Sequence, residues 1–315
     1  MDFHGTLCMI KKLFFMAALL MPGLAYGANP TAGLSVQIVP AGTCQPGNHG
    51  PVRGRPHIAN GTLVADDGCM LRGSAAFQDL AGFQASRDNG HYNIMRDAAF
   101  IGCWYGRYPC SPEHTLQDNL NEIDQGLALA GQTGMYYMIT YFSGPTDNEW
   151  ANTRTFWQTV AARYANNTNV IYELHNEVDF YSEPYANIGA DETSMFQLMR
   201  SLAPNTPIVT YSLECITCPD SRGYGLLKLI SEGPTMDANT VFGFHMYESD
   251  VNGIQNAINT LRQAGIPSMM TEYGYGYGQF AEKIGLMESL GISWQEADGW
   301  QVLVPNGVSV TWPLD

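Results

Sequence analysis

The sequence NVIYELHNE, residues 169–177, and the shorter IPSMMTE, residues 266–272, decide the fold of this chain. Each is a short apolar run bounded by turn-prone or helical sequence, which is typical of a buried β-strand. The first run ends in Glu177 and the second in Glu272. In a parallel α/β barrel the carboxyl ends of all strands meet on the face that carries functional groups. The two runs therefore predict a parallel barrel with two carboxylates on one rim.

Short apolar segments alternate with helical patterns along the rest of the chain, which is the signature of repeated βα units around a parallel sheet. The predicted strands are Met70–Gly73, Tyr92–Met95, Met135–Tyr141, Val170–Leu174, Ile208–Tyr211, Val241–His245, Ser268–Thr271 and Gly291–Trp294. Eight such strands predict a (β/α)8 TIM barrel, and a length of 315 residues suits one barrel domain better than two domains.

Segments with a period of about 3.6 residues lie between these strands and predict the outer helices. One helix is expected to begin with Ser111 as its cap and Pro112 in its first turn. Its apolar face would be formed by Leu116, Leu120, Ile123, Leu127 and Leu129. Another helix is expected around residues 254–261, with Gly265 just after its end.

Both ends of the barrel sequence depart from the regular βα pattern. Residues 62–68, TLVADDG, predict a hairpin that turns at Asp67-Gly68 and closes the floor of the barrel. After Trp300 no further helical pattern follows, because Pro305-Asn306-Gly307 predicts a turn and the alternating residues 308–312 predict a strand. The last βα unit is therefore expected to be irregular.

The first 27 residues have the features of a secretory signal. Lys11 and Lys12 precede the apolar stretch 13–20, and Ala25-Tyr26-Gly27 offers small residues for cleavage. The apolar stretch is too short to span a bilayer. We therefore expect a signal peptide over residues 1–27, a single barrel domain over residues 28–315, a secreted or periplasmic location, and no membrane contact after removal of the signal.

The chain is strongly acidic, with a formal net charge of −15, and loss of the signal would leave it one unit more negative. Such a surface repels nucleic acid and anionic lipid, which argues against partners of those kinds. It is compatible with a neutral substrate such as an uncharged polysaccharide. Acidity that serves solubility alone is the simpler explanation of the charge.

Six cysteines remain after the signal: Cys44, Cys69, Cys103, Cys110, Cys215 and Cys218. An even number in an oxidising compartment predicts disulfides, most simply Cys44–Cys69, Cys103–Cys110 and Cys215–Cys218. The connectivity stays open. The CxxC spacing of the last pair also fits a redox pair or half of a zinc site, although no matching second pair supports zinc.

Polar and aromatic residues follow the predicted strands in a characteristic order. They are Arg96 after YNIM, Asn176-Glu177 after YELH, His245-Met246-Tyr247 after VFGF, Glu272 after SMMT, and Trp294 after GIS. This order resembles the family 5 glycoside hydrolases of clan A, which are cellulase-like retaining enzymes. The resemblance covers nearly the whole mature chain, from NGTLVADDGCMLRG at residues 60–73 to the last strand, and YELHNE is its most specific motif.

The resemblance implies a retaining β-glycoside hydrolase that acts by double displacement, with Glu177 as acid/base and Glu272 as nucleophile. The resemblance also implies supporting roles. Arg96 would hold Glu272 ionised, and Tyr247 would hydrogen-bond the same nucleophile. Asn176 would bind the sugar 2-hydroxyl, His245 would orient Glu177 or a sugar hydroxyl, and Trp294 would stack on the pyranose. The implied activity is endo-acting hydrolysis of β-1,4-linked glucan or a related polysaccharide or oligosaccharide, with no metal and no cofactor.

The sequence departs from the family pattern at two positions. Tyr141 stands where members commonly carry a histidine at the end of the third strand, and Val178 stands where proline usually follows the Asn-Glu pair. Both glutamates are retained, so these departures bear on which sugar is accepted.

Several alternatives stay open at this point. A β-mannanase, another clan A glycosidase and a transglycosylase are alternatives of one class, since all share the covalent intermediate. A barrel that binds carbohydrate without cleaving it is a second class. A metal-dependent hydrolase that uses His175, His245 and carboxylates is a third, although no HxH or HExxH spacing supports it. Taken singly, Arg96 could neutralise a buried carboxylate, while His245, Tyr247 and Trp294 could be ordinary core residues.

Overall fold

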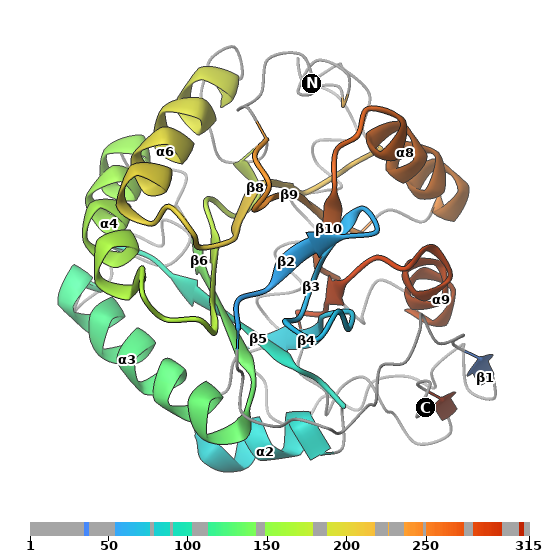
Figure 1. Cartoon of the computed structure of the whole chain (residues 1–315), viewed down its shortest axis with the longest axis horizontal. Helices are drawn as coiled ribbons and strands as arrows, with labels where there is room; N and C mark the ends of the chain where they lie inside the picture. The colour runs from blue at the N-terminus through green and yellow to red at the C-terminus, as the bar shows by residue number, and fades with distance from the viewer. Residues whose placement is uncertain are drawn as a thin grey trace.

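A computed structural model gives the fold of the chain. It describes residues 35–37, 54–75, 79–88, 91–102, 113–142, 149–178, 188–217, 226, 236–247, 250–273, 280–297 and 309–311. Within these residues eight parallel strands form a closed barrel in the order β10-β11-β4-β5-β6-β7-β8-β9. Helices surround the barrel, which Figure 1 shows end-on. The predicted (β/α)8 TIM barrel is confirmed.

The barrel strands are β4 (Arg72–Ala75), β5 (Ile94–Ala99), β6 (Tyr136–Tyr141), β7 (Val170–Glu173), β8 (Ile208–Leu213), β9 (Thr240–His245), β10 (Ser268–Glu272) and β11 (Trp294–Gln295). Each overlaps one of the eight predicted strands. The boundaries differ most at β5, which extends beyond the predicted end at Met95, and at β11, which begins at Trp294 and not at the predicted Gly291.

Side chains on the strands alternate between two hydrophobic layers, as expected when residues two apart share a face. The inner layer fills the barrel with Leu63, Ala65, Leu71, Ile94, Tyr136, Met138, Ile171, Val209, Val241 and Met269. A larger outer layer packs the strands against the helices and includes Phe156, Trp157, Ile254, Met287 and Trp294. The layer in which a residue lies thus decides whether it can reach the barrel interior.

The described helices are α2 (Leu80–Asp88), α3 (Leu116–Thr133), α4 (Glu149–Tyr164), α6 (Ile188–Leu202), α8 (Val251–Gln263) and α9 (Phe280–Leu290). Helix α3 begins after Thr115, which forms a capping box with Asp118. The expected start at Ser111 and Pro112 is therefore wrong, and those two residues lie outside the described ranges. Helix α8 ends as expected just before Gly265, whose φ of 73° is left-handed.

A hairpin of β2 (His57–Ala59) and β3 (Thr62–Val64) turns at Asn60-Gly61, where both residues have positive φ. Such values favour the tight two-residue turns of hairpins. The predicted position of the hairpin turn, Asp67-Gly68, is therefore wrong, because the hairpin turns at Asn60-Gly61 instead. The chain does reverse at Asp67-Gly68 as well, and an isolated bridge joins Val64 to Met70.

The β2–β3 hairpin closes the floor of the barrel, a role that the sequence predicts for a hairpin over residues 62–68. The Ser268 N–H, at the amino end of β10, donates to the Gly61 carbonyl at 2.9 Å. The Thr62 hydroxyl donates to the Ser268 carbonyl at 2.8 Å. Leu63 belongs to the inner layer of the barrel. The hairpin therefore seals the end opposite to the rim that carries Glu177 and Glu272.

Strand β1 (Ser35–Gln37) pairs in parallel with β12 (Ser309–Thr311), which agrees with the strand expected near the end of the chain. Residues 1–27 and 298–308 lie outside the described ranges, so the signal peptide and the irregular last unit stay predictions. Each of the three proposed disulfides includes a cysteine outside those ranges, and the pairings also stay predictions.

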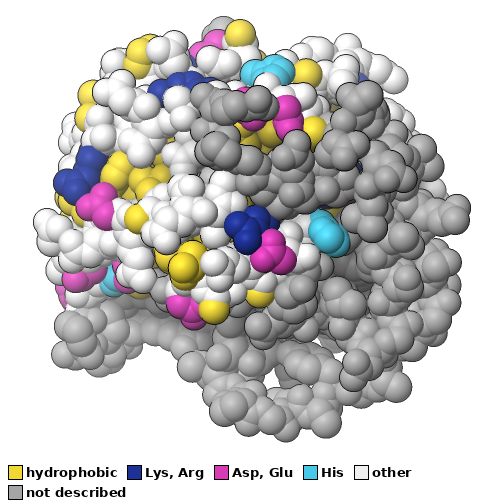
Figure 2. Space-filling model, turned by 60° about the horizontal axis from the view of Figure 1, so that its bottom comes forward, with side chains coloured by type: hydrophobic (Ala, Val, Ile, Leu, Met, Phe, Trp, Pro, Cys, Tyr) yellow, Lys and Arg dark blue, Asp and Glu magenta, His cyan; other side chains and the backbone are white. Residues whose placement is uncertain are grey.

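Among the residues that the structure describes, no helix is both long and apolar enough to cross a membrane. On the face in Figure 2, the described hydrophobic side chains form small separate patches among polar and charged ones. Scattered apolar side chains of this kind are normal on a protein surface in contact with water.

Candidate active site

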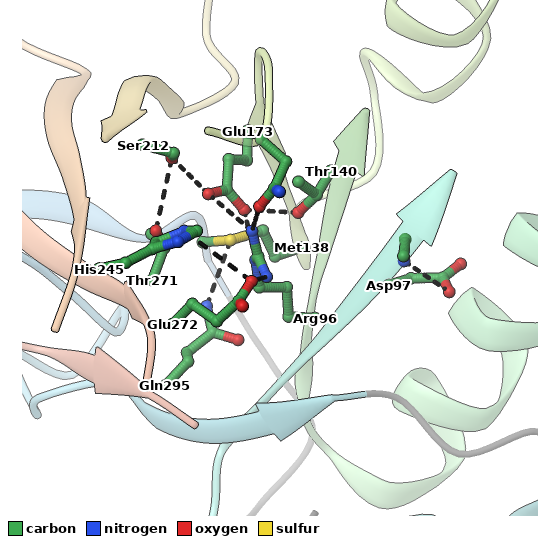
Figure 3. Close-up of polar contacts among 12 residues, drawn as sticks. Arg96, Asp97, Met138, Thr140, Glu173, Ser212, His245, Thr271, Glu272 and Gln295 are labelled. Carbon is green, nitrogen blue, oxygen red and sulfur yellow. Dashed lines mark hydrogen bonds and ion pairs between the residues drawn. The ribbon is translucent and has the colours of Figure 1, made fainter. Parts of the chain in front are cut away.

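Arg96 lies at the centre of a buried polar cluster at the carboxyl end of the barrel (Figure 3). Its guanidinium projects from β5 and donates to both carboxylate oxygens of Glu173 on β7, at 2.6 and 3.1 Å. It also donates to Oε2 of Glu272, the last residue of β10, at 2.7 Å. Arg96 faces inward because Ile94, two residues earlier, belongs to the inner layer.

Glu173 is the fixed partner of Arg96. It is fully buried and also accepts hydrogen bonds from the hydroxyls of Thr140 and Ser212. Burial alone would raise the pKa of the Glu173 carboxyl, but the guanidinium of Arg96 outweighs burial and the pKa lies below its usual value. Glu173 therefore stays ionised and holds Arg96 in one position.

Both carboxylate oxygens of Glu272 are held. Arg96 donates to Oε2, and the hydroxyl of Tyr247 donates to Oε1. Only 7% of the residue is exposed. Charge-assisted hydrogen bonds of this kind are strong and directional, so they fix the carboxylate in one orientation.

Glu177 follows β7 in an uncommon backbone conformation, with a φ of 50°. Its N–H donates to the Ser212 carbonyl at 2.9 Å, and the N–H of the preceding Asn176 donates to the Tyr141 carbonyl at 2.8 Å. Its Oε1 lies 3.1 Å from Nδ1 of His245. Left-handed non-glycine residues that the surroundings hold in place often mark functional sites.

The two glutamates at the strand ends face each other. One oxygen of Glu177, one oxygen of Glu272 and one ring nitrogen of His245 all lie within 4.8 Å of one another. Retaining glycosidases separate their two carboxyl groups by about 5–5.5 Å, and inverting enzymes by about 6.5–9.5 Å. The observed spacing therefore fits the retaining geometry.

His245 lies between the two carboxylates, with Nδ1 at 3.1 Å from Glu177 and Nε2 at 3.9 Å from Glu272. Burial alone lowers the pKa of His245, but the carboxylates of Glu272 and Glu177 outweigh burial, and the pKa lies above its ordinary value. His245 thus joins Arg96 as a second basic group in the cluster.

Asn176 presents an amide to the same cluster. Its Oδ1 accepts from Arg96 Nη2 at 2.7 Å, which fixes the orientation of the amide. Its Nδ2 is buried and has no hydrogen-bond partner among the described residues. A buried donor without a protein partner is available to a ligand.

Six of the seven predicted site residues come together in this cluster: Arg96, Asn176, Glu177, His245, Tyr247 and Glu272. Trp294 does not. It is fully buried in the outer layer, where its ring meets Tyr92 edge-on at 5.9 Å and its Nε1 donates to Glu288 on α9 at 2.7 Å. The prediction that Trp294 stacks on a sugar is therefore wrong, because residue 294 faces the helices.

Phe142, rather than Tyr141, borders the cluster next to β6. The Tyr141 ring is buried 4.9 Å from that of Phe156 on α4, in the outer layer. The Phe142 ring lies 5.3 Å from the guanidinium carbon of Arg96. The residue next in sequence thus supplies an apolar wall at this side of the site.

His175 is not part of the cluster that the metal-dependent alternative requires. Its ring stacks on Trp150 at 5.4 Å, and burial lowers its pKa to about 4, so it is neutral at physiological pH. Among the described residues, the group that could offer ligand atoms to a metal ion is Glu177, His245 and Glu272. Arg96 already supplies positive charge to Glu272.

Sequence reasoning missed Glu173, Thr140 and Ser212, which form the support behind Arg96. A signal for Glu173 exists, because it lies two residues after Ile171 and so shares the inner face of its strand. A carboxylate there requires a buried cation. No comparable pattern marks Ser212, which lies in an irregular part of β8.

A closed (β/α)8 barrel with a buried carboxylate pair at its carboxyl rim defines the class of this protein, which is a TIM-barrel protein with a site of the glycosidase type. The chain belongs to glycosyl hydrolase family 5, because a model of this cellulase family matches residues 72–307. The family resemblance read from the strand ends is thereby confirmed.

Curated relatives include endoglucanase E-5 of Thermobifida fusca, which is 26% identical over 159 residues, 49% of this chain and 33% of the relative. Cellulase CelDZ1 of a Thermoanaerobacterium species is 23% identical over 253 residues, 74% of this chain and 60% of the relative. This chain thus spans one third to three fifths of the length of these relatives.

Solved structures with the same fold include the catalytic domain of Thermobifida fusca endoglucanase Cel5A (E5), with a TM-score of 0.60 and 20% identity over 77% of this chain and 84% of that chain. A mannotriose complex of Thermomonospora fusca β-mannanase has a TM-score of 0.59 and 17% identity over 79% and 85% of the two chains. Both similarities support the same barrel architecture.

Proposed function

We propose that this protein is a retaining β-glycoside hydrolase that cleaves β-1,4-linked glucan internally, with Glu177 as acid/base and Glu272 as nucleophile. The observation that carries the proposal is the spacing of the two carboxylates, whose nearest oxygens lie within 4.8 Å across the barrel mouth. The names of the curated relatives, an endoglucanase and a cellulase, support a glucan as the substrate.

The contacts of the cluster support different roles for the two glutamates. The retaining mechanism needs a charged nucleophile and a protonated acid. Arg96 binds Glu173 and Glu272 but not Glu177 in this structure. The contact with this cation supports Glu272 as the nucleophile and leaves Glu177 as the proposed acid.

The reaction follows from this arrangement. Glu177 protonates the glycosidic oxygen while Glu272 attacks the anomeric carbon, and a glycosyl ester forms on Glu272. The ester removes the negative charge of Glu272, so Glu177 can then act as base toward water. Asn176 Nδ2 donates to the sugar 2-hydroxyl, a hydrogen bond that strengthens as the ring approaches the oxocarbenium geometry. These steps use no metal and no cofactor.

The nucleophile can be tested by trapping. A 2-fluoro β-glycoside with a good leaving group should form a stable ester, and peptide mapping should place the added mass on Glu272. Glu272→Gln should lower kcat by roughly 10⁴-fold or more while oligosaccharide binding is retained. A label on another residue, or normal turnover by the variant, would reject the assignment.

The acid/base is tested by the choice of leaving group. Glu177→Ala should retain far more activity on an activated aryl β-glycoside than on a natural glycan, because a good leaving group needs little protonation. Equal losses on both substrates would count against an acid role for Glu177.

The sugar is identified by a substrate panel. Purified protein should be assayed on β-glucans, mannans, xylans and xyloglucan, with analysis of product lengths. Internal cleavage of β-1,4-glucan is the expected result. Preferential cleavage of mannan would favour the β-mannanase alternative, which the similar fold of a β-mannanase keeps open. Longer products than substrates would indicate transglycosylation.

The same panel separates the remaining classes. Turnover that persists in a metal chelator argues against the metal-dependent alternative. Binding without turnover on every substrate would indicate a carbohydrate-binding barrel. Export to the periplasm or beyond is part of the proposal, and amino-terminal sequencing of the mature protein should give a start at Ala28.

A further inference from the structure

Strand β8 contains a bulge directly beside the proposed site. Its register with β9 is regular up to Thr210 opposite Phe242 and shifts before Leu213 opposite Phe244. The two residues between, Tyr211 and Ser212, have φ values of 71° and 37°. Positive φ is unfavourable for residues with a Cβ, so the surroundings must hold this conformation.

Glu192 holds the bulge from outside the barrel. This residue of α6 is fully buried, and its Oε2 accepts a hydrogen bond from the Tyr211 N–H at 3.2 Å. The bulge takes this amide out of the regular ladder, because bulged residues lack a direct partner on the neighbouring strand. Glu192 therefore satisfies a buried donor that the strained conformation creates.

Gly243 on β9 makes room for the bulge from the other side. A Cβ at this position would lie 2.4 Å from Ser212 Oγ and 3.1 Å from Ser212 Cα. A contact at 2.4 Å forces a shift of the neighbour, so only glycine allows Ser212 to approach β9 this closely. The position of Ser212 is thus fixed by α6 on one side and by β9 on the other.

Ser212 connects to both proposed catalytic glutamates. Its hydroxyl donates to Glu173, whose carboxylate holds Arg96 against Glu272. Its carbonyl accepts the N–H of Glu177 at 2.9 Å. The hydrogen bonds that lead from the nucleophile and those that lead from the acid/base therefore meet at Ser212, one residue of the bulge.

We propose that Glu192 is a positioning residue for the glycosidase reaction, because it holds the Tyr211–Ser212 bulge and thereby sets the relative placement of Glu177 and Glu272. Glu192 lies on the outer side of the barrel wall and acts through Tyr211 and Ser212. The inference rests on the proposed function and adds to it a residue that lies outside the barrel.

The chemistry of Glu192 makes a conservative variant possible. Burial raises the pKa of Glu192 to about 8, and the neighbouring Asp191 adds to this effect. The carboxyl is therefore mainly neutral at pH 7. A glutamine has the same shape and also offers a carbonyl oxygen to the Tyr211 N–H. A leucine of similar volume cannot accept this hydrogen bond.

The experiment compares Glu192→Gln, Glu192→Leu and Ser212→Ala in the full chain, with kcat, KM and the pH profile of kcat/KM measured on a soluble β-glucan. Glu192→Leu should lower kcat by about 10–100-fold with KM changed by less than about 3-fold, because misplacement affects the chemical step. The pH range between the acidic and alkaline limbs of its kcat/KM profile should also change. Glu192→Gln should keep kcat within about 2-fold and retain the wild-type profile.

The Ser212→Ala variant tests the route. It should lower kcat and alter the pH profile in the same way, and its effect should not add fully to that of Glu192→Leu in the double variant. Glu288→Gln is the matched control, since Glu288 is a buried carboxylate of another outer helix that binds Arg72 at 2.7 Å. It should lower Tm while kcat and the pH profile stay at wild-type values.

Several results would overturn the inference. One is a folded Glu192→Leu protein with wild-type kcat and pH profile. Another is a lower Tm of Glu192→Leu with kcat per folded molecule and pH profile at wild-type values, which is the behaviour expected of the Glu288→Gln control. If Glu192→Leu does not fold, wild-type kinetics of Ser212→Ala would overturn it. Wild-type protein without turnover on every glycan would instead reject the proposed function, and this inference would fall with it.

Discussion

Arg96 determines the geometry of the site at the scale of single residues. Its buried guanidinium donates to three side chains. It binds both carboxylate oxygens of Glu173 at 2.6 and 3.1 Å, and one oxygen each of Glu272 and Asn176 at 2.7 Å. Five rigid N–H donors in a plane suit this arrangement, whereas a lysine offers one ammonium on a flexible stem. The residue type is therefore as important as the charge.

Arg96→Lys should lower kcat/KM by about 100-fold or more, because the lysine cannot hold Glu173 and Glu272 at once and a preorganised contact is lost. Steady-state kinetics on a soluble glucan checks this expectation. Arg72→Lys is the control, since Arg72 also forms a fork with a buried carboxylate, Glu288, but in the outer layer. It should lower Tm with little change in kcat/KM. Equal kinetic losses in both variants would contradict a special role for Arg96.

The residues at strand ends could be predicted from the sequence where the end of the strand was clear. Glu177 and Glu272 follow well-defined apolar runs, and the structure brings them together. Trp294 was misplaced because its strand is only two residues long, so its face could not be read from periodicity. In the structure Gln295 points inward and contacts Met138 of the inner layer, which leaves Trp294 on the outer face.

Helix α3 provides a matched pair of glycines at the scale of one element. A Cβ at Gly126 would lie 2.0 Å from the Tyr137 hydroxyl, whereas a Cβ at Gly131 would meet nothing within 4 Å. Gly126→Ala should destabilise the protein by about 1–3 kcal/mol through overpacking. Gly131→Ala should stabilise it by roughly 0.5–1 kcal/mol through helix propensity. Urea unfolding of both variants measures the difference, and effects of equal sign would contradict the packing of α3 on β6.

The contact between α6 and β8 should make stability depend on pH. Glu192 has a raised pKa of about 8 in the folded protein, against an ordinary value of 4.5. Between these values the folded state binds more protons than the unfolded state, so the contribution of Glu192 to stability is complete below pH 4.5 and is lost as the pH rises toward 8. Glutamine does not titrate. The Tm of Glu192→Gln minus that of wild type should therefore rise by at least about 2 °C from pH 5 to pH 8.

A constant Tm difference across this range would show that Glu192 titrates near its ordinary value. Measuring the difference between two proteins removes the effect of all other titrating groups, provided that they are unaffected by the substitution. The prediction concerns stability alone, so it is independent of any assay of turnover.

Element boundaries were harder to predict than element types, for identifiable reasons. Ser111-Pro112 has the composition of a helix start, but Thr115 and Asp118 form a reciprocal capping box closer to the apolar face of α3. Two turn sequences, Asn60-Gly61 and Asp67-Gly68, compete for the hairpin, and both reverse the chain. Only the first is flanked by paired strands, since pairing depends on contacts that the local sequence does not reveal.

The barrel as a whole could be predicted because its signal is repeated. Eight short apolar runs separated by helical patterns admit few arrangements other than a parallel barrel, and each run overlaps an observed strand. The support behind Arg96 could not be predicted in full, because Ser212 reaches Glu173 through a bulge that has no sequence pattern. Contacts between distant segments arise only once the barrel closes.

At the scale of the whole molecule, a substitution at the floor of the barrel should lower the free energy of unfolding without changing catalysis at the rim. Leu63 is fully buried in the inner layer at the floor, so Leu63→Ala should cost about 2–5 kcal/mol of unfolding free energy. At temperatures where the variant is folded, kcat should stay close to that of wild type, because the site lies at the opposite end of the strands. Urea unfolding and kinetics of the same preparation measure both quantities. A stability loss below about 1 kcal/mol would show that the hairpin does not seal the barrel.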